Sequence, residues 1–135
     1  MIIFIHGLGG SVFGNHKLVG HWVDQKTAVI TFNNRGHGKI SKTRRLNSSK
    51  KGYANILIGQ AHEVFSDCID DIQGVVNFAK KRAIKEIYLA GHSTGCQKSA
   101  YYAGKKIDKA IKGLILLAPI SDYASIVKFD VCGRL

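Results

Sequence analysis

The serine at position 93 stands in a pattern that predicts a nucleophile. Residues 87–97 read Ile-Tyr-Leu-Ala-Gly-His-Ser-Thr-Gly-Cys-Gln, so four apolar residues run into a Gly-x-Ser-x-Gly sequence. A strand, a sharp turn and a helix in this order hold a serine in a strained conformation, with its hydroxyl above the edge of a sheet. Gly91 and Gly95 are expected where strand and helix cross closely, because side chains there would collide.

A serine that attacks a carbonyl carbon creates an oxyanion, which two backbone N–H groups must stabilise. Thr94 follows Ser93 directly and supplies one N–H at the predicted start of the helix. The second N–H is expected in the glycine-rich loop after the first strand, at Leu8. The sequence therefore predicts an oxyanion hole formed by Leu8 and Thr94.

The loop around Leu8 reads His6-Gly7-Leu8-Gly9-Gly10. Gly7 and Gly9 would let its backbone approach a substrate closely, and tight turning alone is the alternative explanation for them. His6 is expected to brace this loop. No clustered metal ligands are visible in the sequence, so we expect neither a metal site nor a cofactor.

Three segments in order resemble the α/β-hydrolase family: Phe4–Gly10, Phe32–Gly38 and Gly91–Gly95. The resemblance covers most of residues 1–122 and implies a serine hydrolase of the carboxylesterase type. Such an enzyme would form an acyl-serine on a small ester or acyl substrate. It also implies that Arg35 ties its turn to neighbouring elements.

The family's order of catalytic residues is serine, acid, histidine, and this sequence departs from it. None of the six histidines follows Ser93, and they stand at positions 6, 16, 21, 37, 62 and 92. Asp122 is a candidate for the acid, and the favoured alternative is that it caps the next helix together with Ser121. We therefore expect the amino-terminal portion of a hydrolase domain, over residues 1–122, that lacks the triad acid and histidine and is very slow by itself. Residues 123–135 form an unassigned tail.

Hydrophobic patterning predicts an α/β fold of three layers, α/β/α, with a short and mostly parallel sheet of about four strands. A long irregular segment is expected at Gly36–Gly59, which is rich in lysine and arginine. The resemblance gives the strand order Thr27–Phe32, Ile2–Ile5, Glu86–His92, Gly113–Ala118. Helices are expected at Asn15–Asp24, with Asn15 as the cap, at Gln60–Arg82 and at Thr94–Lys105.

The composition bounds the function without naming it. The chain has 135 residues, a net charge of +11 and 45% hydrophobic residues, with a mean hydropathy of −0.01. Three irregularly spaced cysteines are expected as reduced thiols in a cytoplasmic protein. No apolar run is long enough to cross a membrane, and no membrane partner is expected. The excess of lysine and arginine over acidic residues favours binding to anionic partners. The alternative explanation is that the charge serves only solubility.

Other functions remain open from the sequence. A hydrolase-like protein without catalysis could bind a small acyl or hormone-like ligand in the same crevice. The basic segment Lys39–Lys51 could bind a polyanion, but it lacks interleaved aromatic residues before Tyr53, so nucleic acid is not favoured and a solvated lid is the simpler interpretation. An acyltransferase would use the same acyl-serine.

Overall fold

The computed structural model describes residues 1–35, 37–38, 41–47 and 52–121. The strands are β1 (Ile2–Ile5), β2 (Val29–Thr31), β3 (Ser41–Asn47), β4 (Gly52–Ile58), β5 (Ile87–His92) and β6 (Ile111–Leu117). The helices are α1 (His16–Gly20), α2 (Cys68–Lys81) and α3 (Thr94–Lys105), with 3-10 turns η1 (Gln60–His62) and η2 (Phe65–Asp67). Asp122 and the tail lie outside the described residues.

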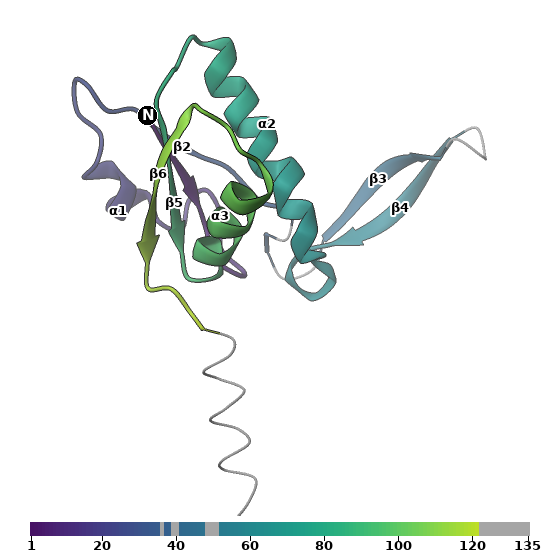
Figure 1. Cartoon of the computed structure of the whole chain (residues 1–135). Coiled ribbons are helices and arrows are strands. Elements are labelled where there is room, and N and C mark those ends of the chain that lie inside the picture. Colours follow the sequence, from purple (N-terminus) through teal and green to yellow (C-terminus); the bar gives the residue numbers. More distant parts are fainter. Residues whose placement is uncertain (36, 39–40, 48–51, 122–135) are drawn as a thin grey trace, which may run out of the picture.

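Four strands form a parallel sheet in the order β2-β1-β5-β6. This confirms the expected order, and the register places Ile5 opposite Gly91 and Gly91 opposite Leu116. Since all four strands run the same way, their carboxyl ends meet at one edge of the sheet (Figure 1). Loops at that edge of an open α/β sheet usually form the binding crevice.

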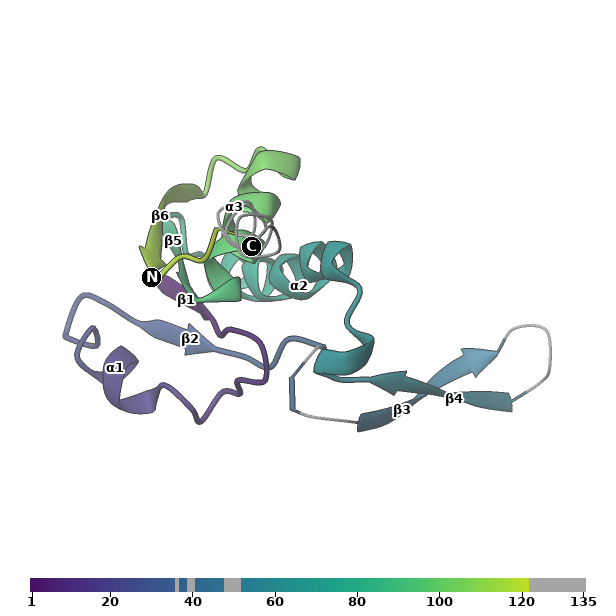
Figure 2. The same cartoon turned by 90° about the horizontal axis from the view of Figure 1, so that it is seen from below.

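Helices cover both faces of this sheet, so the predicted three layers are present (Figure 2). On one face, α2 and α3 pack on β1 and β5 through fully buried side chains that include Ile72, Val76 and Tyr102. On the other face, Val19 of α1 packs with Phe4 and Ala90, and Trp22 contacts this cluster. The two cores hold β1 and β5, the strands that lead into the loops of interest.

The expectation of an irregular segment at Gly36–Gly59 was wrong. Strands β3 and β4 pair antiparallel from Ser41 opposite Ile58 to Asn47 opposite Gly52. β4 is rich in residues with high β-propensity, such as Tyr53, Ile56 and Ile58, and the abundance of lysine and arginine concealed this signal. The hairpin also breaks the expected alternation of strand and helix.

The β3–β4 hairpin projects away from the body of the protein in both views (Figures 1 and 2). Its two ends lie side by side, because Gly59 N–H donates to Arg35 O and Gln60 N–H donates to Gly38 O, each at 3.3 Å. The hairpin is therefore an insertion that leaves and rejoins the fold at one point, just after β2.

The long helix expected at Gln60–Arg82 begins only at Cys68. Before it, Glu63 and Val64 have extended backbones, with ψ of 125° and 110°. Val64 and Phe65, which stand at helical spacing within the expected Gln60–Arg82 helix, are 57% and 42% exposed. The apolar residues at helical spacing therefore begin earlier in the sequence than the helix itself does.

The remaining boundaries differ less from expectation. α1 covers only five residues of the expected Asn15–Asp24 helix, and Asn15 makes no capping hydrogen bond with its side chain. α3 was predicted correctly, while β6 begins two residues before the expected Gly113. Within the described residues, no helix combines the length and apolarity needed to cross a membrane.

Candidate active site

Ser93 lies at a sharp bend between β5 and α3, with φ of 54° and ψ of −126°. This backbone conformation is rare for a residue with a side chain and costs on the order of 1–3 kcal/mol. Neighbouring hydrogen bonds hold the bend, since Ser93 N–H donates to Leu117 O of β6 at 3.0 Å and Cys96 N–H donates to Ser93 O at 2.9 Å. The strained turn that the Gly-x-Ser-x-Gly pattern predicts is present.

Gly91 and Gly95 permit the close crossing of strand and helix. A Cβ on Gly91 would overlap the carbonyl group of Gly95, and a Cβ on Gly95 would overlap Ile5 O of β1. Such overlaps involve backbone atoms that no rotamer change can move. Both glycines are therefore required by the geometry of the turn, as the sequence predicted.

The loop after β1 lies against the side chain of Ser93. A Cβ built on Gly7 would lie 2.9 Å from Ser93 Cβ and 3.4 Å from Ser93 Oγ, so the backbone at Gly7 is a wall of the space beside the hydroxyl. Leu8 follows at the surface with 56% exposure. On the other side of Ser93, Thr94 is the first residue of α3, where N–H groups lack partners within the helix.

His6 is buried and braces this loop, as expected. Its Nδ1 lies 2.8 Å from Gly7 O, and Asn34 N–H donates to its Nε2 at 3.1 Å. This pair of contacts fits a neutral ring that carries its proton on Nδ1. Burial, as the largest cause, lowers the pKa of His6 below its ordinary value, and the charge of Lys98 acts in the same direction. With both nitrogens occupied, His6 cannot take a proton from Ser93.

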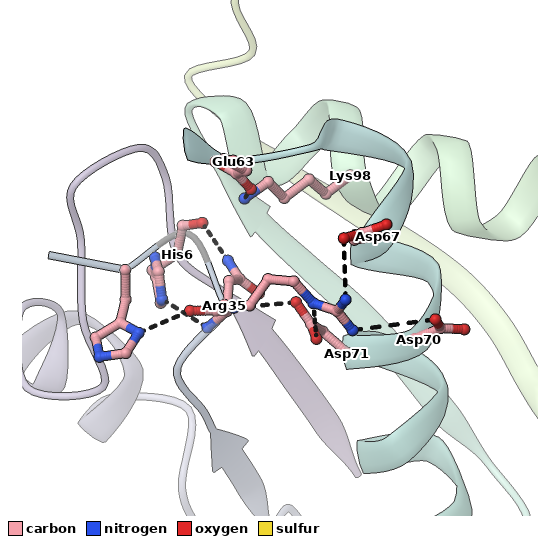
Figure 3. Close-up of polar contacts among 9 residues, drawn as sticks. His6, Arg35, Glu63, Asp67, Asp70, Asp71 and Lys98 are labelled. Atoms are coloured by element: carbon pink, nitrogen blue, oxygen red, sulfur yellow. Dashed lines mark hydrogen bonds and ion pairs between the residues drawn. The ribbon is translucent and has the colours of Figure 1, made fainter. Parts of the chain in front are cut away.

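Arg35 ties the turn after β2 to the start of α2 (Figure 3). Its Nε donates to Asp71 Oδ1 at 2.8 Å and its Nη1 to Asp67 Oδ2 at 3.0 Å. The backbone N–H of Arg35 also donates to Asp71 Oδ2 at 3.0 Å. The pKa of Arg35 is raised by these carboxylates, which outweigh its partial burial. The structural role that the resemblance implied is confirmed.

A buried ion pair between Lys98 and Glu63 escaped the sequence analysis (Figure 3). The Lys98 side chain of α3 is 2% exposed and that of Glu63, between η1 and η2, is 11% exposed. Lysine is almost never fully buried unless it is paired. Helical spacing was the available signal, because Lys98 shares one face of α3 with the buried residues Gly95, Ser99 and Tyr102.

The Glu63 segment also contacts the loop after β1. A Cβ on Gly9, whose φ is 69°, would collide with Gln60 Oε1. Gln60 and Glu63 therefore link the base of the hairpin to the loop on one side and, through Lys98, to the helix that begins at Ser93 on the other.

The acids that follow Ser93 in the sequence are not brought to it within the described residues. Asp108 is paired with Lys80 at the opposite end of the sheet, and its Oδ1 accepts from Ala110 N–H at 3.0 Å. This pairing lowers the pKa of Asp108. Asp122 and Asp130 lie outside the described residues. The His37 Nδ1–H donates to Asn34 O at 2.9 Å, in the turn that contains Arg35.

Comparison with known proteins agrees with this arrangement. The sequence profile of the serine aminopeptidase, S33 family matches residues 1–131. Protein phosphatase methylesterase 1 of Candida albicans is 30% identical over 122 residues, which are 88% of this chain and 29% of that protein. A monoacylglycerol lipase from Paleococcus ferrophilus has a similar fold, with a TM-score of 0.60 and 20% identity, over 99% of this chain and 46% of the lipase chain. The chain thus spans less than half the length of these two proteins. It belongs to the serine aminopeptidase S33 family of α/β hydrolases.

Proposed function

We propose that this chain carries the nucleophile and the oxyanion hole of a serine esterase that acts on a small ester or acyl compound. The observation that carries the proposal is the backbone of Ser93, strained at φ 54° and held beside the Gly7 backbone. A structural serine gains nothing from such a conformation, whereas a nucleophile must stand clear of the sheet edge. The printed names of the two similar proteins, a methylesterase and a lipase, support ester substrates.

In the proposed reaction, Ser93 Oγ attacks the carbonyl carbon of the ester. The N–H groups of Leu8 and Thr94 stabilise the resulting oxyanion, and the start of α3 contributes the positive end of its dipole. The alcohol then leaves, and water hydrolyses the acyl-serine. Each of the two N–H donors is expected to contribute about 3 kcal/mol of transition-state stabilisation.

The base that accepts the serine proton is not among the groups that the structure assigns. His6 is excluded by its hydrogen bonds, and no hydrogen bond among the described residues joins a histidine to Ser93. A serine hydrolase without its base keeps only the catalysis that binding and the oxyanion hole provide. We therefore expect slow turnover from the 135-residue chain.

Labelling with a fluorophosphonate probe tests this proposal. We expect slow covalent labelling of the full chain that Ser93→Ala abolishes, together with weak hydrolysis of p-nitrophenyl acetate. Background labelling of Cys68 and Cys96 should be small, because burial raises the pKa of Cys68 to about 11 and also raises that of Cys96. A chain that stays unlabelled while binding acyl ligands would instead be a non-catalytic binder. Ser93-dependent turnover at ordinary esterase rates would contradict the expected lack of a base.

A further inference from the structure

The β3–β4 hairpin carries a concentrated positive charge. Residues 38–62 contain no aspartate or glutamate, yet they hold six of the chain's 20 lysine and arginine residues, namely Lys39, Lys42, Arg44, Arg45, Lys50 and Lys51. Opposite charges that could neutralise them are therefore absent from the segment itself. Such a basic segment attracts an anionic surface over about one Debye length.

The same hairpin exposes apolar side chains on β4. Tyr53 is 70% exposed, Leu57 is 47% exposed and Ile56 is 36% exposed. Leu57 and Ile56 also line a cavity of about 210 Å³ at the base of the hairpin, with Val64 and His62. An isolated two-stranded hairpin is marginally stable in water. Its apolar side chains therefore gain by burial against a partner.

The hairpin is placed where it can reach a partner without disturbing the core. It projects from the body in both views (Figures 1 and 2), and neither apolar cluster of the body includes any of residues 52–57 of β4, the part of the hairpin whose side chains the structure describes. It leaves the fold after β2, at the carboxyl edge of the sheet, where Ser93 also lies.

We propose that the β3–β4 hairpin docks the protein on the anionic surface of a lipid bilayer. The lysine and arginine residues of β3 would pair with lipid phosphates, while Tyr53 and Leu57, which share one face of β4, enter the boundary between headgroups and acyl chains. A leucine beside one tyrosine suits a lipid interface, whereas single-stranded nucleic acid would need several aromatic platforms. This peripheral contact requires no membrane-crossing helix.

The inference deepens the proposed function, because an esterase docked in this way would meet acyl substrates at a lipid surface. It rests on the hairpin alone and is measured without turnover. Failure of Ser93 to label would overturn the esterase proposal and leave this one standing. Failure to bind vesicles would overturn the docking proposal and leave the esterase proposal standing.

Co-sedimentation with vesicles tests the proposal on the full chain. We expect salt-sensitive binding to phosphatidylcholine mixed with phosphatidylglycerol, and little binding to phosphatidylcholine alone. Lys42→Gln with Arg44→Gln should lower the partition coefficient about tenfold to thirtyfold, from about 1 kcal/mol for each charge near the surface. Tyr53→Ser with Leu57→Ser should lower it in the same direction while leaving the net charge unchanged.

The matched control removes two charges elsewhere. Lys85 and Lys109 are exposed and line a surface cavity at the other end of the sheet, so Lys85→Gln with Lys109→Gln should bind vesicles nearly as the unaltered chain does. Circular dichroism checks that every variant is folded. Absence of binding, equal losses in the control and hairpin variants, or tighter binding to a single-stranded oligonucleotide than to anionic vesicles would each overturn the proposal.

Discussion

Individual residues show where this fold stores conformational energy. Ser93 keeps a backbone conformation that favours glycine, and two glycines beside it keep the strand and helix close enough to enforce that conformation. His6 is held neutral beneath the adjacent loop. The strain at Ser93 and the neutral state of His6 can both be tested by measuring the stability of variants, without any assay of turnover.

Replacing Ser93 with glycine should stabilise the protein. Ser93→Gly relieves a strain on the order of 1–3 kcal/mol, partly offset by the greater freedom of glycine in the unfolded chain. Ser93→Ala removes the same hydroxyl but keeps the strain. Urea unfolding should therefore give Ser93→Gly a free energy of unfolding about 1 kcal/mol above that of Ser93→Ala. Equal values for the two variants would show that the bend is unstrained.

Stability should fall as the pH drops below the ordinary pKa of histidine, 6.5. Burial lowers the pKa of His6 in the folded state, so below pH 6.5 the unfolded chain binds the additional proton. The contribution of the neutral His6 ring to the free energy of unfolding is thus complete above pH 6.5, and it is lost as the pH falls toward the pKa of His6 in the folded state. Melting temperatures measured from neutral pH to about pH 5 should fall more steeply for the unaltered chain than for His6→Gln.

The exposed histidine His21 provides the control for that measurement. His21→Gln should leave the pH dependence of the melting temperature unchanged. Parallel curves for His6→Gln and the unaltered chain would mean that the buried ring does not control this loss.

At the scale of elements, the sequence predicted what local spacing specifies. The Gly-x-Ser-x-Gly turn, the four sheet strands and α3 could be predicted because each is written in a few contiguous residues. The start of α2 could not, since the extended backbone at Glu63 accompanies a pairing with Lys98, which lies 35 positions later. The antiparallel hairpin was missed because charge was given more weight than β-propensity.

The Lys98–Glu63 pair should contribute more to stability than a surface pair. Lys98→Met leaves the carboxylate of Glu63 largely buried without its partner, and removal of one member of a buried pair typically costs about 3–5 kcal/mol. We expect a loss near 3 kcal/mol in chemical unfolding, much of it recovered when Lys98→Met is combined with Glu63→Leu.

The Lys80–Asp108 pair is the matched comparison. The Lys80 side chain is 43% exposed, and removal of an exposed ion pair usually costs less than about 1 kcal/mol. A loss on Lys80→Met as large as that on Lys98→Met, or a failure of the double variant to recover stability, would contradict the assignment of Lys98 as a buried, paired charge.

At the scale of the molecule, the described residues divide into a layered body and an attached hairpin. The body contains both apolar cores, the strained serine and the loop beside it. The hairpin adds charge and exposed apolar surface, and residues 52–57, whose side chains the structure describes, add nothing to the core. Sequence patterning could reveal the body, since its elements alternate at characteristic spacing, but it could not reveal that the insertion closes at its own base.

Removal of the hairpin should leave the body folded. Replacing residues 39–58 with two glycines would join Gly38 to Gly59, which lie together through the bonds to Arg35 and Gln60. The melting temperature should change by only about 4 °C, equivalent to roughly 1 kcal/mol. Calorimetry checks this, and the loss of a cooperative transition would show that the hairpin is required for folding.

Because the two ends of the hairpin meet at its base, the hairpin can evolve separately from the rest of the protein. On the proposed docking, substitutions in β3 and β4 would alter what the molecule adheres to without moving Gly7 or Ser93, whose positions depend on the sheet. Adhesion and chemistry would then be open to separate selection. A related hydrolase could acquire a new cellular address by exchanging one short appendage while its reactive centre stays as it was.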